Sequence, residues 1–246
     1  MKLLLSIVMA VKDSEALLIQ SLDALSRTNV NGRGVEILIM NGGRSLDGSI
    51  CQNHPLPVTM INEPDQGIYD AWNKGIALAK GEFIAFIGAG DCVRPNYLQE
   101  MTALWKRSPN ADLLLCKQQQ YLKNGRPLRV FGKPWNWKKF QQNFSIPHIG
   151  CWHKMALFAE HGNFDTSYKV SGDYEWLLRV GKGLKVVFTP EVLLDVPVGG
   201  MSDKYGHVFH ESRRARARHT DASKWNLVYV DYAYRMRKKL RKWLWG

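Results

Sequence analysis

The chain has 246 residues, of which 45% are hydrophobic, and this is enough for one large domain or two small ones with a sizeable core. The sequence holds no apolar stretch of the roughly 20 residues that a membrane-spanning helix needs. Its four cysteines show neither zinc spacing nor a disulfide framework, so we expect a reducing compartment. The net charge of +12 indicates an anionic partner, but residues 203–246 carry +8 of it, which argues against a basic body wrapped around nucleic acid.

Apolar runs and helical spacings alternate along the first hundred residues. Buried strands are predicted at 3–11, 35–40, 58–61 and 83–87, and helices at 14–26 and 68–79. The first run could also be a short secretory signal, but it is equally typical of a first buried strand, which is our interpretation. The alternation predicts an α/β fold with a parallel sheet and helices on its faces.

Residues 106–200 are less regular. The run 113–122 alternates weakly after an apolar start, which predicts a strand near the edge of the sheet. Residues 132–152 are rich in aromatic residues, Gly and Pro, and are interpreted as a loop or the wall of a cleft. A short helix is expected to begin near Ser171 or Asp173, and a further strand is expected after residue 185.

Three of the predicted strands are followed by loops that carry Asp, Asn or Gly. Because the carboxyl ends of parallel strands meet at one edge of a sheet, we expect Asn41, Asp47, Asp65 and Asp91 to converge on one crevice. The alternative for the stretch "GAGD" at 88–91 is a plain turn, since Gly and Asp are ordinary turn residues.

Three stretches together resemble the inverting glycosyltransferases of family 2, which have the GT-A fold: 63–91, which contains "EPDQGIYDAWNKG" and ends in "GAGD"; 146–179, which contains "SGDYEWLLR"; and "GGMS" at 199–202. The resemblance covers roughly residues 3–202. It implies a Rossmann-like, mainly parallel sheet flanked by helices, with a catalytic domain at 1–202, a donor half at 1–105 and an acceptor half at 106–202. The subgroup it suggests makes bacterial exopolysaccharide, colanic acid or O-antigen.

The resemblance implies transfer of a sugar from a nucleotide-diphosphate sugar, with a UDP-sugar as first expectation, to a saccharide acceptor. A divalent cation, Mn²⁺ or Mg²⁺, neutralises the leaving diphosphate in such a reaction and prefers carboxylate oxygens. The implied metal ligands are Asp91 and, after "GGMS", His207. The implied donor-binding positions are Asn41, Asp65, Gly67, Asn73, Lys74, Gly90 and Asp91. Two positions depart from the family pattern: Asn41 stands where a carboxylate is usual, and only one acid of the DxD motif remains.

Direct displacement at the anomeric carbon needs a general base for the acceptor hydroxyl. Asp173 matches the family's base position, and its alternative role is that of a helix N-cap. On the acceptor side the implied residues are His148, Glu175 and Trp152. Glu175 could instead be a supporting group paired with Arg179, and aromatic core packing is the alternative for the tryptophan.

The segment 203–246 reads as a basic C-terminal extension that ends in an amphipathic helix. Its apolar positions recur every three or four residues, and its basic residues lie largely on the other side: Trp225, Tyr229 or Val228, Tyr232, Met236, Leu240 and Trp243, against Arg235, Lys238, Arg241 and Lys242. Such a helix is typical of a segment that lies on an anionic membrane. We therefore expect a cytoplasmic protein at the inner face of the cell membrane. The resemblance to the family implies a polyprenyl-diphosphate-linked acceptor there.

Three alternatives remain open from the sequence. The extension could be a helix packed on the body, or the chain could be a nucleic-acid-binding module that uses its basic aromatic end, although no nucleic acid is expected as a partner. The reduced "GAGD" stretch could also belong to an inactive, transferase-like binding protein.

Overall fold

The structure is a computed structural model of the chain, and it describes residues 3–28, 34–199, 208–221 and 236. His207, most of the "GGMS" loop and all but one residue of the predicted interfacial helix lie outside the described residues. Among the helices that the structure describes, none is long and apolar enough to cross a bilayer.

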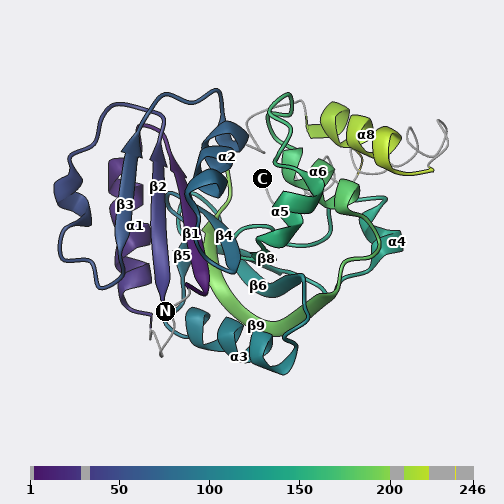
Figure 1. Cartoon of the computed structure of the whole chain (residues 1–246), viewed down its shortest axis with the longest axis horizontal. Helices are drawn as coiled ribbons and strands as arrows, with labels where there is room; N and C mark the ends of the chain where they lie inside the picture. The colour runs from purple at the N-terminus through teal and green to yellow at the C-terminus, as the bar shows by residue number, and fades with distance from the viewer. Residues whose placement is uncertain (1–2, 29–33, 200–207, 222–235, 237–246) are drawn as a thin grey trace.

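The first half of the chain forms the parallel part of the sheet. Strands β1 (Leu5–Val11), β2 (Val35–Asn41), β3 (Val58–Asn62) and β4 (Phe83–Gly88) lie in the order β3-β2-β1-β4, side by side on the left of Figure 1. Each begins and ends within two residues of its prediction, because β-branched and aromatic residues dominate these runs and polar or glycine residues end them.

The second half of the chain continues the same sheet in mixed directions. Strand β8 (Trp152–Lys154) runs antiparallel between β4 and β6 (Leu113–Tyr121), and β9 (Val186–Pro197) runs parallel to β6. The short strand β5 (Cys92–Val93) is antiparallel to β9, and β7 (Pro127–Phe131) pairs with the outer half of β6.

The prediction that 113–122 lies near the edge of the sheet is wrong. The apolar start of β6 is fully buried and is hydrogen-bonded to β8 on one side and to β9 on the other. The weak alternation that suggested an edge belongs to its polar second half, which extends beyond β8 and pairs with β7.

Helices cover both faces of the sheet (Figure 1). Helices α1 (Glu15–Ser26) and α3 (Tyr97–Arg107) pack in one hydrophobic cluster with Ile7 and Met9 of β1. Helices α2 (Ile68–Leu78), α5 (Ala156–His161) and α6 (Gly172–Val180) share the second cluster with Val8. Successive strand residues point to opposite faces, so one apolar strand supplies both cores.

Three shorter or later elements complete the described fold. They are the 3-10 helix η1 (Gly48–Cys51), helix α4 (Trp137–Phe140) and helix α8 (Val208–His219). Segment 132–152 is largely loop, as expected, and α4 interrupts it. Helix α8 packs against α6, at the upper right of Figure 1.

Candidate active site

The carboxyl ends of the first four strands lie level with one another at one edge of the sheet. Val11 is paired with Asn41, and Asn41 with Asn62, while Gly88 of β4 is paired with Ala10. The loops that follow these strands therefore start from a common edge, where open α/β sheets bind ligands.

Asn41 organises the loop that follows β2. Its Nδ2 donates to the carbonyl of Arg44 and to Oδ1 of Asn62, both over 2.7 Å, and its Oδ1 accepts from the N–H of Gly43 over 3.2 Å. The side chain is buried, with 1% of its surface exposed. An aspartate at this position could not donate either of the two Nδ2 hydrogen bonds, which gives a local reason for the departure from the family pattern.

Asp65 lies against the same loop. A Cβ atom at Gly42 would be 1.6 Å from its Oδ2, so only a glycine permits this contact. The Oδ1 atom of Asp65 accepts from the N–H of Gly67 over 2.9 Å, immediately before α2. Asp13, after β1, accepts from the N–H of Arg44 over 3.1 Å, which brings a further carboxylate to this edge.

Asp47, also expected at this edge, is engaged within its own loop. It is exposed and accepts from the N–H and the hydroxyl of Ser49 at the start of η1. These hydrogen bonds lower the pKa of its carboxyl. Its role is that of a local cap.

Asn73 and Lys74, expected in the donor pocket, are both engaged in contacts within the protein. Asn73 exchanges two hydrogen bonds with the backbone of Phe164, over 2.9 and 3.0 Å. The ammonium of Lys74 lies 2.7 Å from a carboxylate oxygen of Glu63 and 2.7 Å from the carbonyl of Pro64. The structure thus gives both residues the role of tying α2 to the neighbouring loops.

Asp91 follows β4 through a glycine turn. The N–H of Gly90, whose φ is +97°, donates to Oγ of Ser21 over 2.9 Å, and the N–H of Gly88 donates to Oδ2 of Asp91 over 2.8 Å. Asp91 is 9% exposed, and burial raises the pKa of its carboxyl to about 7 against the opposing effect of the Gly88 hydrogen bond. It is a desolvated acid at the edge where open α/β sheets in general bind ligands.

The chemistry of Asp91 fits a divalent cation, although only in part. A carboxylate with one oxygen bonded to a single backbone N–H is a hard oxygen ligand. Within the described residues, no group of three or more His, Cys, Asp or Glu side chains could hold a metal ion. The expected second ligand, His207, lies outside that part of the chain. Of the two expected ligands, Asp91 is the one among the described residues, and a cation there would also take oxygens of the substrate.

Asp173 is the second residue of α6 and is half-buried. Its Oδ1 accepts from the hydroxyl of Tyr69 over 3.1 Å and from the N–H of Tyr174 over 2.9 Å. Burial raises the pKa of its carboxyl to about 6, and both hydrogen bonds oppose this rise. Ser171, not Asp173, occupies the N-cap position, so the alternative of a plain N-cap does not describe Asp173.

Glu175 turns away from the site. It is 1% exposed, its Oε2 lies 3.0 Å from the guanidinium of Arg179, and its Oε1 lies 2.7 Å from Nε2 of His219 in α8. It has the supporting role that the sequence left open, and the expected acceptor contact has no exposed surface to use.

His148 and Trp152 also lie inside the protein. Trp152 is fully buried, and its Nε1 donates to the hydroxyl of Tyr97 over 3.0 Å, so the packing alternative describes it and a stacked sugar does not. His148 is 4% exposed and stacks against Trp72 and Phe86, whose rings also contact each other. Burial, with His153 close by, holds its pKa well below the usual range, so the ring is neutral.

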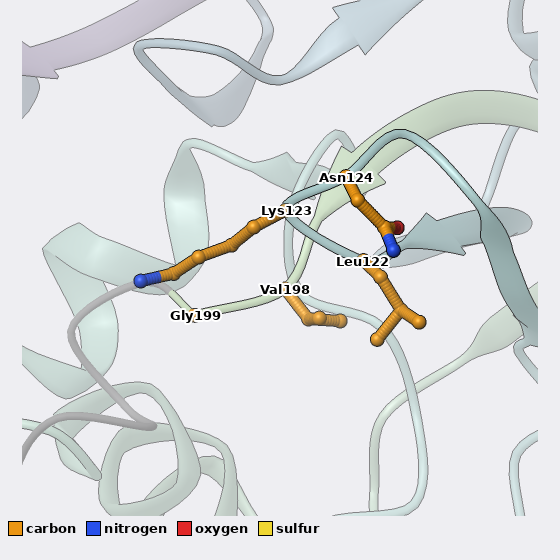
Figure 2. A pocket seen from close by; sticks show the side chains of 5 residues that line it. All are labelled: Leu122, Lys123, Asn124, Val198 and Gly199. Carbon is orange, nitrogen blue, oxygen red and sulfur yellow. The ribbon is translucent and has the colours of Figure 1, made fainter. Parts of the chain in front are cut away.

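An open cavity of about 410 Å³ lies at the same edge of the sheet. It is lined by Leu122, Lys123, Asn124, Val198 and Gly199. Figure 2 shows Lys123 extending past Gly199, away from the side chains of Leu122 and Val198. Strand β9 runs from the neighbourhood of Asp91 to this cavity. Its Asp195 is paired with Cys92, the residue after Asp91, and Val198 of the cavity lies three residues further along the chain.

Two functional candidates, Tyr69 and Glu211, were not predicted from the sequence. Tyr69 was interpreted only as part of a helix. Its place in the first turn after the Asp65–Gly67 loop could have indicated that it lies at the same edge of the sheet as the candidate acids. Glu211 of α8 was read as part of a basic extension, although it is the one acid between residues 208 and 219. That a single acid interrupts so basic a helix could have drawn attention to it.

The order of the sheet, the helices on both faces and the acids at one edge define the GT-A class of nucleotide-sugar transferase folds, as expected. The model of the family described as Glycosyl transferase family 2 matches residues 6–160, which is more than half of the chain. The chain belongs to this family. Membership confirms the expected family and, with it, the expected enzyme class.

EpsH of Bacillus subtilis (strain 168), named as a glycosyltransferase, is 33% identical over 116 residues. This match covers 45% of the chain and 32% of EpsH, so the matched part spans about a third of that relative.

Two solved structures have a similar fold. S. aureus TarS 1-349 in complex with UDP-GlcNAc has a TM-score of 0.68 at 16% identity, with 93% of this chain and 70% of that chain covered. The mannosyltransferase PcManGT from Pyrobaculum calidifontis, in complex with GDP-Man and Mn²⁺, has a TM-score of 0.58 at 16% identity, with 95% and 64% covered.

Proposed function

We propose that this protein transfers a sugar from a nucleotide-diphosphate sugar, with a UDP-sugar as the first candidate, to a saccharide acceptor with inversion at the anomeric carbon. The observation that carries the proposal is the contact of Asp173 with Tyr69, because it joins a carboxylate of raised pKa to the helix that follows the Asp65–Gly67 loop. A base beside the donor loop is the arrangement that direct displacement needs.

Asp173 is suited to the role of general base. A carboxyl with a pKa of about 6 is largely ionised at pH 7 and is more basic than an ordinary aspartate. The Tyr69 hydroxyl and the Tyr174 N–H both donate to Oδ1 and fix the orientation of the group. In the proposed reaction Asp173 takes the proton of the acceptor hydroxyl. At the same time the oxygen of that hydroxyl attacks the anomeric carbon and the nucleoside diphosphate leaves.

A divalent cation, Mn²⁺ or Mg²⁺, completes the proposal. Asp91 is the residue that would hold it, and the bound cation would neutralise the charge that develops on the leaving diphosphate. The raised pKa of Asp91 supports this assignment, because a desolvated carboxyl gains from a cationic partner. The Mn²⁺ that accompanies the donor in the complex of PcManGT is consistent with it.

A uridine donor is the first candidate because TarS 1-349, which has a similar fold, was solved in complex with UDP-GlcNAc. Thermal shift measurements with a panel of nucleotide sugars in the presence of Mn²⁺ test this choice. A UDP-sugar should raise the Tm of the protein but not that of Asp91→Ala. Stabilisation by GDP-sugars alone would contradict the uridine assignment, and stabilisation by no nucleotide sugar would contradict the proposed function.

We further propose a lipid-linked acceptor and a role in bacterial surface polysaccharide synthesis, with the protein held at the inner face of the membrane by residues 222–246. The support is the amphipathic basic pattern of that segment in the sequence. Removing residues 222–246 should abolish sedimentation with anionic vesicles and leave donor binding intact. Unchanged sedimentation would contradict the membrane role, and loss of a salt-sensitive shift with single-stranded nucleic acid would favour the alternative partner.

A further inference from the structure

Helix α8 lies in the segment that the sequence assigns to a membrane-surface extension, and beyond the residues that the family model matches. Its face toward the body carries Glu211, which is 7% exposed. A carboxylate is rarely buried to this degree unless the protein satisfies its oxygens. The hydrogen-bond partners of Glu211 therefore show which part of the body α8 holds.

The carboxylate of Glu211 binds three consecutive backbone N–H groups. Oε1 accepts from Lys169 over 2.9 Å, and Oε2 accepts from Val170 over 2.9 Å and from Ser171 over 3.0 Å. The hydroxyls of Ser171 and Ser212 are also hydrogen-bonded over 3.2 Å. Charge-assisted bonds of this kind are about twice as strong as neutral ones, so the segment that leads into α6 is firmly held.

The same helix holds α6 at a second point. At the other end of α8, Nε2 of His219 lies 2.7 Å from Oε1 of Glu175, which Arg179 also contacts. Asp173 lies between the two attachments along the chain. The Tyr69 hydroxyl of α2 holds its carboxylate. The candidate base thus lies between two attachments to α8, one through the backbone and one through the Glu175 side chain, and has a side-chain contact to α2.

We propose that Glu211 is a positioning residue for Asp173, and that α8 is consequently a working part of the catalytic unit and not of a separate extension. This inference rests on the proposed function, because it takes Asp173 as the base. Glu211 holds the backbone two residues before Asp173, and its negative charge acts on the same carboxyl.

The charge of Glu211 gives the proposal a signature that simple packing lacks. Burial is the main cause of the raised pKa of Asp173, and the Glu211 charge adds to it, while Tyr69 on α2 opposes it. Replacing Glu211 with neutral glutamine therefore removes a contribution that raises the pKa of Asp173. We expect that pKa to fall.

Two measurements on the full chain test the inference. The carboxyl of Asp173 is titrated by NMR with ¹³C-labelled aspartate, its signal being the one lost in Asp173→Asn. Release of UDP from UDP-GlcNAc is measured with Mn²⁺ present. For Glu211→Gln we expect a lower pKa of Asp173 and a release rate reduced about tenfold, since small displacements of a base are costly. The matched control is Arg213→Ala, an exposed residue of the same helix, which should change neither measurement.

The outcomes separate the inference from the proposed function. Unchanged titration in folded Glu211→Gln overturns the inference, whether or not the release rate falls, because a purely structural residue would leave the pKa in place. If Glu211→Gln does not fold, Glu211→Asp decides: it keeps the charge but shortens the reach, so release should fall, and an unchanged rate overturns the inference. Full activity of Asp173→Asn also overturns the inference, because Asp173 is then not the base. Absence of UDP release from the wild-type protein with every nucleotide sugar, by contrast, overturns the proposed function, while the titration of Asp173 still reports on Glu211.

Discussion

The hydroxyl of Tyr69 donates a hydrogen bond of 3.1 Å to Oδ1 of Asp173 and so joins the first turn of α2 to the first turn of α6. The two residues are 104 positions apart in the sequence. Helix α2 begins directly after Gly67, whose N–H is bonded to Asp65, and Asp65 lies against Gly42 of the β2 loop. A continuous series of contacts therefore runs from the edge of the parallel sheet to the candidate base.

Asp173→Asn tests the base directly. The amide has nearly the same shape but cannot take a proton from the acceptor, so kcat should fall by about a thousandfold while the donor KM changes little. Steady-state kinetics of UDP release in the presence of acceptor measure both constants. Transfer at the wild-type rate would exclude Asp173 as the base. Asp47→Asn, a change at the exposed cap of η1, is the matched control and should leave kcat unchanged.

Tyr69→Phe tests the contact between the helices through the pH profile. The hydroxyl stabilises the ionised form of Asp173, and its loss should raise the pKa of that carboxyl above about 6. Because the base acts when ionised, kcat rises as pH increases through this pKa. The acid limb should therefore move to higher pH, with a rate loss of about tenfold below pH 6 and a smaller one at pH 8. An acid limb that stays in place would show that the contact is not maintained during the reaction.

The parallel half of the fold could be predicted from the sequence because its signals are local. A run such as Phe83–Ile87 is apolar throughout, and the glycines after it end the strand. The second half could not be predicted in the same way. Strand β8 has only three residues, and β9 shifts register against β6, so their places depend on partners that lie far away in the sequence. Helix α3 was not predicted, although its buried residues Tyr97, Leu98, Met101 and Leu104 recur at helical spacing.

The residues of the candidate site also differ in whether local sequence could predict their roles. Asp91 and Asp173 could be identified because each stands in a motif that matches the family pattern. The burial of Glu175 and Trp152 could not be predicted, since residue type does not say which side of an element faces the core. Tyr69 and Glu211 act on α6 across long separations, and no local pattern encodes a partner 40 or more residues away.

Cation binding should depend on pH through Asp91. Its pKa of about 7 refers to the protein without a cation, and a cation binds only the ionised carboxylate. The proton therefore competes with the metal, and the apparent affinity for Mn²⁺ should fall about tenfold for each pH unit below 7 and level off above it. Calorimetric titration at pH 8, 7 and 6 with UDP present measures this. Asp173→Asn should show the same slope, and a flat profile would mean that another residue holds the cation.

Asp91→Asn should stabilise the fold while it weakens the site. The folded protein holds the Asp91 proton more tightly than the unfolded chain, because burial raises the pKa from 3.8 to about 7. The stability of the wild-type protein therefore falls as pH rises from 4 to 7 and stays low above 7.

The amide of Asp91→Asn carries no charge to desolvate, and its oxygen can still accept from the Gly88 N–H. At pH 8 with chelator present, the free energy of unfolding should rise by up to roughly 4 kcal/mol, the equivalent of that pKa difference. At pH 4 the two proteins should be nearly equal. Urea unfolding at both pH values measures the difference. A variant that is less stable than the wild type at pH 8 would show that Asp91 stabilises the turn and is not a cation ligand.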